Sequence, residues 1–305
     1  MLADAHIPVL YHEVLAGLQP HPGGKYIDGT LGAGGHAAGI LRQSAPDGQL
    51  LGLDLDPAAL AVARQSLAPF GARAIVRQAT YVAMAAQAEG FAPVDGILLD
   101  LGLSSLQLAD PARGFAFQTD GPLDMRFSPR QKLTAAEIVN DWPLDELADV
   151  LWRYGEERHS RKLAQAIGAA RPILTTRRLA DVVAAAAGGR REKIHPATRV
   201  FQALRIAVNG ELESVATVLP VAMKLLKPGG RLAVISFHSL EDRIVKTFMR
   251  ERARGPGDDP TQPTRPVFTP DLAEVTRKPI VAEEAEIARN PRARSAKLRI
   301  AERLA

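Results

Sequence analysis

The chain has 305 residues, of which 46% are hydrophobic, so it is long enough to bury a large core in one large domain or two ordinary ones. Its net charge of +4 permits a polyanionic partner but falls short of the charge density of a histone-like binder. It contains no cysteine, which excludes disulfides, thiolate zinc sites and thiol nucleophiles. The chemistry must therefore come from oxygen or nitrogen groups or from a cofactor.

The first eleven residues contain neither a basic segment nor a long apolar run. This start predicts neither a signal peptide nor a membrane anchor, so the expected location is the cytoplasm.

Short β-rich runs alternate with helical stretches from Lys25 to Asp100, which is the pattern of parallel βα units and predicts a doubly wound α/β sheet. Pro57 suits the first turn of a helix expected over residues 57–67, and another helix is expected to begin at Ala37. The predicted strands cover residues 25–28, 49–54, 74–77 and 96–100.

The rhythm changes after Gln107, where residues 110–130 resemble a loop and residues 133–209 carry apolar side chains at helical spacing. The strand and helix pattern then resumes. We therefore predict a Rossmann-like sheet domain made of residues 1–107 and 209–305, with an all-helical insertion at residues 108–208. In the second part of the sheet domain we expect a helix at 211–226, a strand at 231–236, an exposed loop at 254–270 and final strands at 275–280 and 297–304.

The first predicted strand runs into the glycine-rich segment 28–36, Asp-Gly-Thr-Leu-Gly-Ala-Gly-Gly-His. Glycines let the backbone approach a ligand closely, and the following helix offers unpaired amides. Asp54 ends the second strand about twenty residues further on, where an acidic side chain can bind ribose hydroxyls, although a solvated turn aspartate is the alternative. This pattern suits a nicotinamide cofactor and S-adenosylmethionine equally.

The residues after the fourth predicted strand favour methyl transfer. Amino-methyltransferases place an Asp or Asn with a short turn there, facing the methyl donor, and this chain has Asp100 followed by Leu101-Gly102-Leu103. An oxidoreductase would need a proton donor beside the nicotinamide, and no suitable spacing stands out. We keep a nicotinamide-dependent oxidoreductase as the alternative.

An ordered series of motifs runs through nearly the whole chain. They lie at residues 6–10 (HIPVL), 26–36 (YIDGTLGAGGH), 95–105 (DGILLDLGLSS), 113–115 (RGF), 120–126 (DGPLDMR), 154–158 (YGEER), 195–199 (HPATR), 236–243 (SFHSLEDR) and 290–295 (NPRARS). In this series the chain resembles the ribosomal small-subunit RNA methyltransferase H family, also called MraW.

The resemblance implies a class I methyltransferase sheet that uses S-adenosylmethionine to methylate N4 of a cytidine in the decoding region of 16S ribosomal RNA, within the small ribosomal subunit. It implies no metal and no membrane, and it leaves the oligomeric state open. A non-catalytic ribosome-assembly factor and a DNA amine methyltransferase are the alternatives. By motif position the cofactor contacts fall on Gly34, Gly35, His36, Asp54, Asp100 and Gln107. Tyr81 stands where the family usually has a phenylalanine, so its role in stacking on adenine is a looser match.

Asp100 is the first candidate for a catalytic acceptor. The lone pair of the cytosine amine is delocalised into the ring, and an acceptor that binds the amine hydrogens favours the reactive pyramidal nitrogen. Related amino-methyltransferases carry an aromatic residue in the turn that follows, which Leu101-Gly102-Leu103 replaces here. A ring that stacks on the base must then come from elsewhere, with core packing as the alternative role for each candidate. The candidates are Phe115, Phe117, Trp142 and Phe237.

His238, just after the fifth strand, can accept a proton after transfer or hydrogen-bond Asp242. Asp124 and Arg126 can contact phosphate or base, or pair with each other. Basic clusters predict contact with RNA, with a solvated surface or a brace for the final strand as alternatives. They comprise Arg158, Arg161, Lys162, Arg171, Arg177, Arg178, Arg190, Arg191 and Lys193, and near the C-terminus Arg289, Arg292, Arg294 and Lys297.

Overall fold

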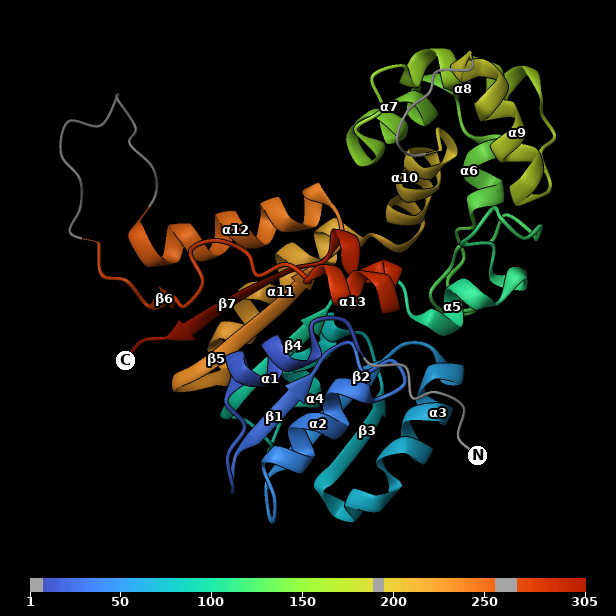
Figure 1. The fold of residues 1–305 in the computed structure, drawn as a ribbon. Coiled ribbons are helices and arrows are strands. Elements are labelled where there is room, and N and C mark those ends of the chain that lie inside the picture. The colour runs from blue at the N-terminus through green and yellow to red at the C-terminus, as the bar shows by residue number, and fades with distance from the viewer. Residues whose placement is uncertain (1–7, 189–194, 256–267) are drawn as a thin grey trace. The chain divides into compact units, whose positions relative to one another are not determined.

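The computed structural model describes residues 8–188, 195–255 and 268–305, apart from the side chain of Ser105 (Figure 1). Residues 6–7, Arg190, Arg191, Lys193 and most of the expected loop at 254–270 lie outside this part of the chain. The chain divides into two compact units, which we call the sheet unit (residues 1–102 and 212–305) and the helical unit (residues 103–211). The boundaries expected from the sequence are at 107/108 and 208/209.

The sheet unit contains a seven-stranded sheet in the order β3-β2-β1-β4-β5-β7-β6 (Figure 1). Strands β1 to β5 run parallel to one another, whereas β7 is antiparallel to both β5 and β6. The predicted α/β class is therefore confirmed. The strands are β1 (Lys25–Asp28), β2 (Gln49–Asp54), β3 (Ala74–Gln78), β4 (Val94–Asp100), β5 (Leu226–Ser236), β6 (Leu272–Glu274) and β7 (Lys297–Arg303).

The strand expected at 275–280 is wrong. Strand β6 ends at Glu274, and Ile280 forms only an isolated bridge with Leu298. The amides of Val275 and Thr276 both donate to the carbonyl of Ile300, so the alternating ladder breaks there. Pro279, which has no amide hydrogen, cannot restore it.

Alternate residues of the central strands enter two separate buried clusters. Leu51 and Ile97 belong to one cluster, and Leu50 and Leu98 belong to the other. Because neighbouring residues of a strand point to opposite faces, both faces of the sheet are covered by apolar side chains. The cluster of Leu50 and Leu98 is completed by helices α1 (Tyr11–Leu18), α2 (Gly35–Gln43) and α3 (Pro57–Leu67). The cluster of Leu51 and Ile97 is completed by helices α4 (Met84–Gln87), α11 (Glu211–Leu225) and α12 (Ser239–Arg254).

Short helical segments complete the sheet unit. Helix α2 begins at Gly35 rather than at the expected Ala37, because Gly34 already adopts the left-handed conformation that ends the loop. Helix α3 begins at the expected Pro57, where the side chain of Asp56 accepts a hydrogen bond from the Ala58 amide at 2.9 Å. The remaining segments are η1 (Ala68–Arg73), η2 (Tyr81–Ala83), α13 (Glu284–Arg289) and η4 (Pro291–Ser295).

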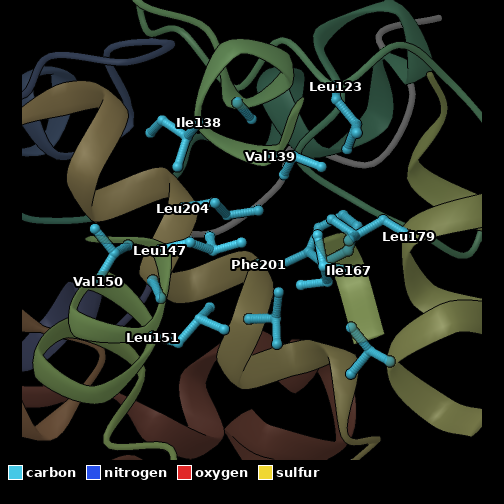
Figure 2. Packing of buried hydrophobic residues seen from close by; sticks show 14 of the residues in the cluster. Leu123, Ile138, Val139, Leu147, Val150, Leu151, Ile167, Leu179, Phe201 and Leu204 are labelled. Atoms are coloured by element: carbon cyan, nitrogen blue, oxygen red, sulfur yellow. The ribbon is translucent and has the colours of Figure 1, made fainter. Parts of the chain in front are cut away.

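The helical unit has a core of its own (Figure 2). Ile138, Leu147, Leu179 and Leu204, which come from four different helices, are completely buried in it. Independent burial of this kind is what allows an insertion to fold as a compact unit. Its helices are α5 (Ser105–Ala109), α6 (Ala135–Asp141), α7 (Leu144–Gly155), α8 (Ser160–Ala169), α9 (Thr176–Ala187) and α10 (Ala197–Asn209), with η3 (Pro111–Arg113).

A helix that spans a membrane must be both long enough and apolar enough to cross it. In the part of the chain that the structure describes, no single helix meets both requirements. The consecutive helices Ala197–Asn209 and Glu211–Leu225 meet them only when they are counted together.

Candidate active site

Three aspartates end three neighbouring parallel strands of the sheet unit. Asp54 ends β2, Asp28 ends β1 and Asp100 ends β4. Strand β1 lies between β2 and β4, so the chain runs outward from β1 on one side and returns to its other side at β4. In open α/β sheets ligands bind at the carboxyl ends of the strands beside such a reversal.

Thr30 links two of these aspartates. The carboxylate of Asp28 is 1% exposed, and its Oδ1 accepts hydrogen bonds from the Thr30 amide at 3.1 Å and from the Thr30 hydroxyl at 3.4 Å. The same hydroxyl oxygen accepts a hydrogen bond of 2.6 Å from the backbone amide of Asp100. Burial raises the pKa of Asp28 to about 7, although the hydrogen bonds from Thr30 oppose this rise.

Asp100 holds an unpartnered carboxylate oxygen. Its Oδ1 is buried and has no hydrogen-bond partner among the described residues, while its Oδ2 lies 3.8 Å from Nδ1 of His36. Burial raises the pKa of Asp100 to about 7; the charge of Arg292 opposes the rise, and the charges of Asp28 and Glu241 add to it. Buried polar atoms without partners are rare, and together with a strongly shifted pKa they indicate a functional site.

The glycine loop is held by Asp54. Its Oδ2 accepts a hydrogen bond from the Gly32 amide at 2.8 Å, and its Oδ1 accepts one from the Asp56 amide at 2.9 Å. Gly32 and Gly34 have φ angles of +53° and +85°, which other residues rarely adopt. The N-terminus of α2, which follows Gly34, has no side-chain cap.

These features fit S-adenosylmethionine. An uncapped helix N-terminus favours the carboxylate of the methionine moiety. The oxygens of Asp54 keep lone pairs that can accept ribose hydroxyls, and the unpartnered oxygen of Asp100 is available to the reacting groups. Gly35 contributes through its small size, because a Cβ there would lie 2.4 Å from Cγ of Pro8.

The imidazole of His36 is buried and hydrogen-bonded to the backbone. It is 5% exposed, and its Nε2 lies 3.0 Å from the carbonyl oxygen of Val9, which can only accept, so Nε2 carries the proton. Burial lowers the pKa of His36 to about 4, so the ring is neutral at pH 7. Contact between His36 and a cofactor stays a prediction, and the backbone of the first turn of α2 is the part that can make it.

Two further expected cofactor residues lie in different units. Tyr81 begins η2, and a Cβ built on Gly29 would lie 3.1 Å from the Cβ of Tyr81, so this residue packs against the start of the glycine loop. Gln107 belongs to the helical unit, where its Oε1 accepts a hydrogen bond from the Ser104 amide at 3.0 Å and caps α5. Their cofactor contacts remain predictions.

His238 caps α12. Its Nδ1 accepts a hydrogen bond from the Glu241 amide at 3.3 Å, and its Nε2 lies 3.2 Å from Oε1 of the buried Glu241. A proton on Nδ1 would break the cap, which argues against the expected role as proton acceptor. The expected hydrogen bond to Asp242 is wrong, because Asp242 instead accepts from Nε of Arg299 at 2.7 Å and from Nζ of Lys297 at 3.3 Å.

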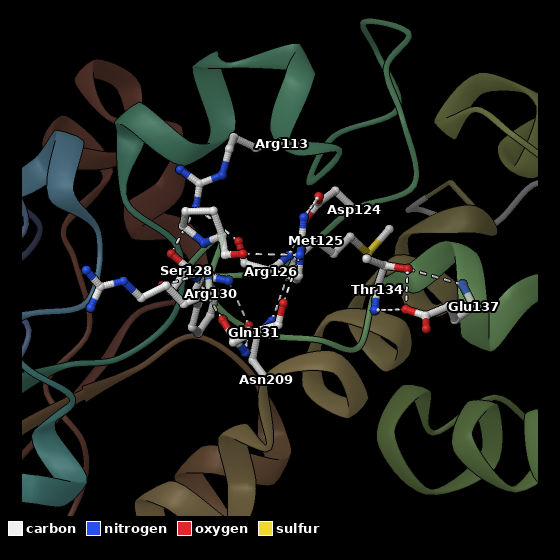
Figure 3. Close-up of polar contacts among 12 residues, drawn as sticks. Arg113, Asp124, Met125, Arg126, Ser128, Arg130, Gln131, Thr134, Glu137 and Asn209 are labelled. Atoms are coloured by element: carbon white, nitrogen blue, oxygen red, sulfur yellow. Dashed lines mark hydrogen bonds and ion pairs between the residues drawn. The ribbon is translucent and has the colours of Figure 1, made fainter.

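The expected substrate residues lie in the helical unit. Asp124 and Arg126 pair with each other through two hydrogen bonds of 2.9 and 2.7 Å (Figure 3). This pairing is the alternative to substrate contact that the sequence left open. Phe115 is only 7% exposed and belongs to the core, and the half-buried Trp142 packs against the same core. The burial of Phe115 argues against base stacking, and substrate contact by all four residues remains a prediction.

The sequence did not indicate that three residues act on Asp100. Thr30, Glu241 and Arg292 lie in motifs that carried the family resemblance, yet no spacing rule relates them to the fourth strand. The three motifs share one feature that the sequence shows. Each of them follows or precedes an expected strand, at the edge of the sheet where the aspartates lie.

A seven-stranded sheet with one antiparallel strand next to its last edge, a glycine loop after β1 and acidic residues after β2 and β4 define a class I S-adenosylmethionine-dependent methyltransferase. The chain belongs to the MraW methylase family, whose model matches residues 3–304. Both the expected family and methyl transfer from S-adenosylmethionine are thereby confirmed, and the oxidoreductase alternative is excluded.

Similar proteins from several bacteria are known. The chain is 54% identical over 310 residues to the ribosomal RNA small subunit methyltransferase H of Thermomicrobium roseum, covering 100% of this chain and 95% of that protein. It is 51% identical over 305 residues to the protein of the same name from Xanthomonas oryzae, covering 98% and 89%. Among solved structures, an rRNA methylase from Streptococcus thermophilus has a TM-score of 0.45 at 10% identity, covering 99% of this chain and 100% of that chain.

Proposed function

We propose that the protein transfers a methyl group from S-adenosylmethionine to N4 of a cytidine in the decoding region of 16S ribosomal RNA, acting on the small ribosomal subunit in the cytoplasm. Its relatives, about half identical to it over nearly their whole length, are named as small-subunit ribosomal RNA methyltransferases. The observation that carries the chemistry is the buried, unpartnered Oδ1 of Asp100 at the end of β4.

An exocyclic amine is a poor nucleophile, and Asp100 offers what it lacks. When bound, S-adenosylmethionine supplies an electrophilic methyl group on a positively charged sulfur. The free Oδ1 can accept a hydrogen bond from the amine, which favours the pyramidal nitrogen whose lone pair attacks. As the new N–CH3 bond forms and the S–CH3 bond breaks, one amine hydrogen leaves as a proton. A carboxyl group whose pKa is about 7 is well matched to take it up near neutral pH.

Thr30 positions this carboxyl group. Its hydroxyl oxygen accepts a hydrogen bond of 2.6 Å from the Asp100 amide, and its own amide donates to the carboxylate of Asp28. The backbone that carries the acceptor carboxylate is thus tied directly to the glycine loop. Holding reacting groups in a fixed geometry lowers the entropic part of the barrier.

Nucleoside mass spectrometry of 16S ribosomal RNA tests the proposal. RNA from a deletion strain should lack one N4-methylated cytidine, and the intact gene should restore it, whereas a gene encoding Asp100→Ala should not. Tritium transfer by the purified protein to small subunits, free 16S RNA and DNA then identifies the substrate. Unchanged methylation in the deletion strain, or transfer to DNA alone, would overturn the proposed substrate.

A further inference from the structure

One loop of the helical unit is held by an unusual number of polar side-chain contacts. We call residues 124–134 the clamped loop (Figure 3). Besides its pair with Asp124, Arg126 donates from Nη1 to the carbonyls of Pro129 at 3.3 Å and Gln131 at 2.8 Å. The guanidinium group is therefore used within the loop itself.

Two residues outside the loop fasten it to the rest of the unit. Asn209, at the end of α10, accepts hydrogen bonds from the Phe127 amide at 2.9 Å and from the Gln131 side chain at 3.1 Å, and it donates to the Met125 carbonyl at 2.8 Å. Arg113 donates to the carbonyls of Arg126 and Phe127, both at 3.0 Å. A loop whose polar groups are satisfied in this way is rigid before any partner binds.

Two cationic side chains of the clamped loop take no part in these contacts. Arg130 and Lys132 are exposed, and neither side chain has a partner in the part of the chain that the structure describes. The loop contains one acidic residue, Asp124, which Arg126 already neutralises. The next one along the chain, Glu137, accepts from the Thr134 hydroxyl at 2.8 Å.

Two basic residues that were expected to contact RNA are used differently. Arg171 donates to the carbonyls of Val139 and Trp142, both at 2.7 Å, and Arg177 donates to the carbonyl of Gln118 at 2.7 Å. These guanidinium groups brace the helical unit. The free cations of the clamped loop, by contrast, are presented on a rigid backbone, which reduces the entropy lost when they bind a partner.

We infer that the clamped loop is a docking surface for the RNA backbone, on which Arg130 and Lys132 contact phosphates and Arg126 is a positioning residue. Phosphate contacts fix the register and orientation of a nucleic acid without reading its sequence. The inference rests on the proposed function, since it names the surface by which an RNA substrate is held.

Binding of purified small subunits at several salt concentrations tests the contacts. For the full-length Arg130→Ala/Lys132→Ala variant we expect KM for the subunit to rise about tenfold, with kcat and affinity for S-adenosylmethionine unchanged. The slope of log affinity against log salt should fall by about 1 for each lost phosphate contact. The matched control is Arg277→Ala/Lys278→Ala, which removes an exposed Arg-Lys pair from the sheet unit.

The outcomes separate the two proposals. An unchanged salt slope in folded Arg130→Ala/Lys132→Ala, or an equal loss in the control, would overturn the docking surface. A wild-type protein that binds subunits but transfers no methyl group would overturn the proposed function instead, because the salt slope needs no methyl transfer.

The positioning role of Arg126 has its own signature. Arg126→Ala should raise KM and speed hydrogen exchange of the loop amides while leaving the salt slope unchanged, since no phosphate contact is lost. Arg126→Lys should not rescue KM, because lysine cannot make the two parallel bonds to Asp124. A salt slope reduced by about 1 would make Arg126 an RNA ligand and overturn its positioning role.

Discussion

The two ends of strand β4 carry aspartates in opposite surroundings. At its start, Asp95 accepts hydrogen bonds from the Lys25 amide at 2.8 Å and from His21 Nε2 at 3.0 Å, and it forms an ion pair with Lys227. Burial alone would raise the pKa of Asp95, but these partners outweigh it and hold the pKa below its usual value. At the other end, Asp100 has one oxygen without a partner and a pKa raised to about 7.

This difference shows how one strand serves two purposes. A carboxylate whose lone pairs are filled by the protein ties elements together, as Asp95 ties the start of β1 to the start of β5. A buried carboxylate oxygen without a hydrogen-bond partner lowers the stability of the fold, but it is available to a substrate. Substitutions at the two ends should therefore separate stability from catalysis.

The largest effect is expected at Asp100. Asp100→Ala should lower kcat at least 100-fold, because it removes the acceptor for the amine proton, while the fold changes little and the affinity for the donor falls less than kcat. Tritium transfer, calorimetry and circular dichroism measure the three properties. Near-normal turnover by a folded variant would remove Asp100 from the mechanism.

The wild-type rate should also depend on the ionisation of Asp100. Only the ionised form can take up the amine proton, so the rate should rise with pH and level off above about pH 7. Asp100→Asn should show a low rate that does not follow this curve.

At the other end of β4 the expected effect is on stability. Asp95→Ala should lower the free energy of unfolding by roughly 2 kcal/mol, because it leaves the part-buried amide of Lys25 without its acceptor and removes the ion pair with Lys227. Urea denaturation measures this loss, and kcat should stay within about twofold of the wild type. A large loss of kcat in the folded variant would show that the two ends are not independent.

Thr30→Val should lower kcat about tenfold, which corresponds to about 1.4 kcal/mol. Valine keeps the shape of threonine but leaves the amide of Asp100 without an acceptor. Thr30→Ser, which retains the hydroxyl, should restore most of the rate, whereas a purely structural role for the methyl group predicts the reverse order. Donor affinity, measured by calorimetry, should change less than kcat in both variants.

For Asp28 the expected effect appears in the pH dependence of stability. A carboxyl group whose pKa is raised by folding contributes stability that is present below about pH 4 and lost as the pH rises through about 7. The full slope is about 1.4 kcal/mol per pH unit for one proton. Asp28→Asn should flatten the fall between pH 4 and 7 in urea denaturation; an unchanged slope would assign the titration to another group.

Local sequence patterns determined most elements of the sheet unit and the place of its glycine loop. Strand β1, strand β2 and helix α3 begin and end where the residues predict, because apolar periodicity, a capping aspartate and a helix-starting proline act within a few residues. Glycines at 32 and 34 likewise adopt the positive φ angles for which only glycine is well suited. The strand expected at 297–304 lies at Lys297–Arg303, whereas the one expected at 275–280 was misplaced, because β6 is defined by its pairing with β7.

Only the tertiary structure decided which of the conspicuous polar residues are free and which are used. Arg126 and His238 stand out in the sequence, yet the fold occupies both with internal partners. Thr30 meets Asp100 across 70 residues of chain, and Asn209 meets Phe127 across 82. Contacts at such separations leave no periodic trace in a sequence, because they depend on how whole elements pack rather than on the preferences of neighbouring residues.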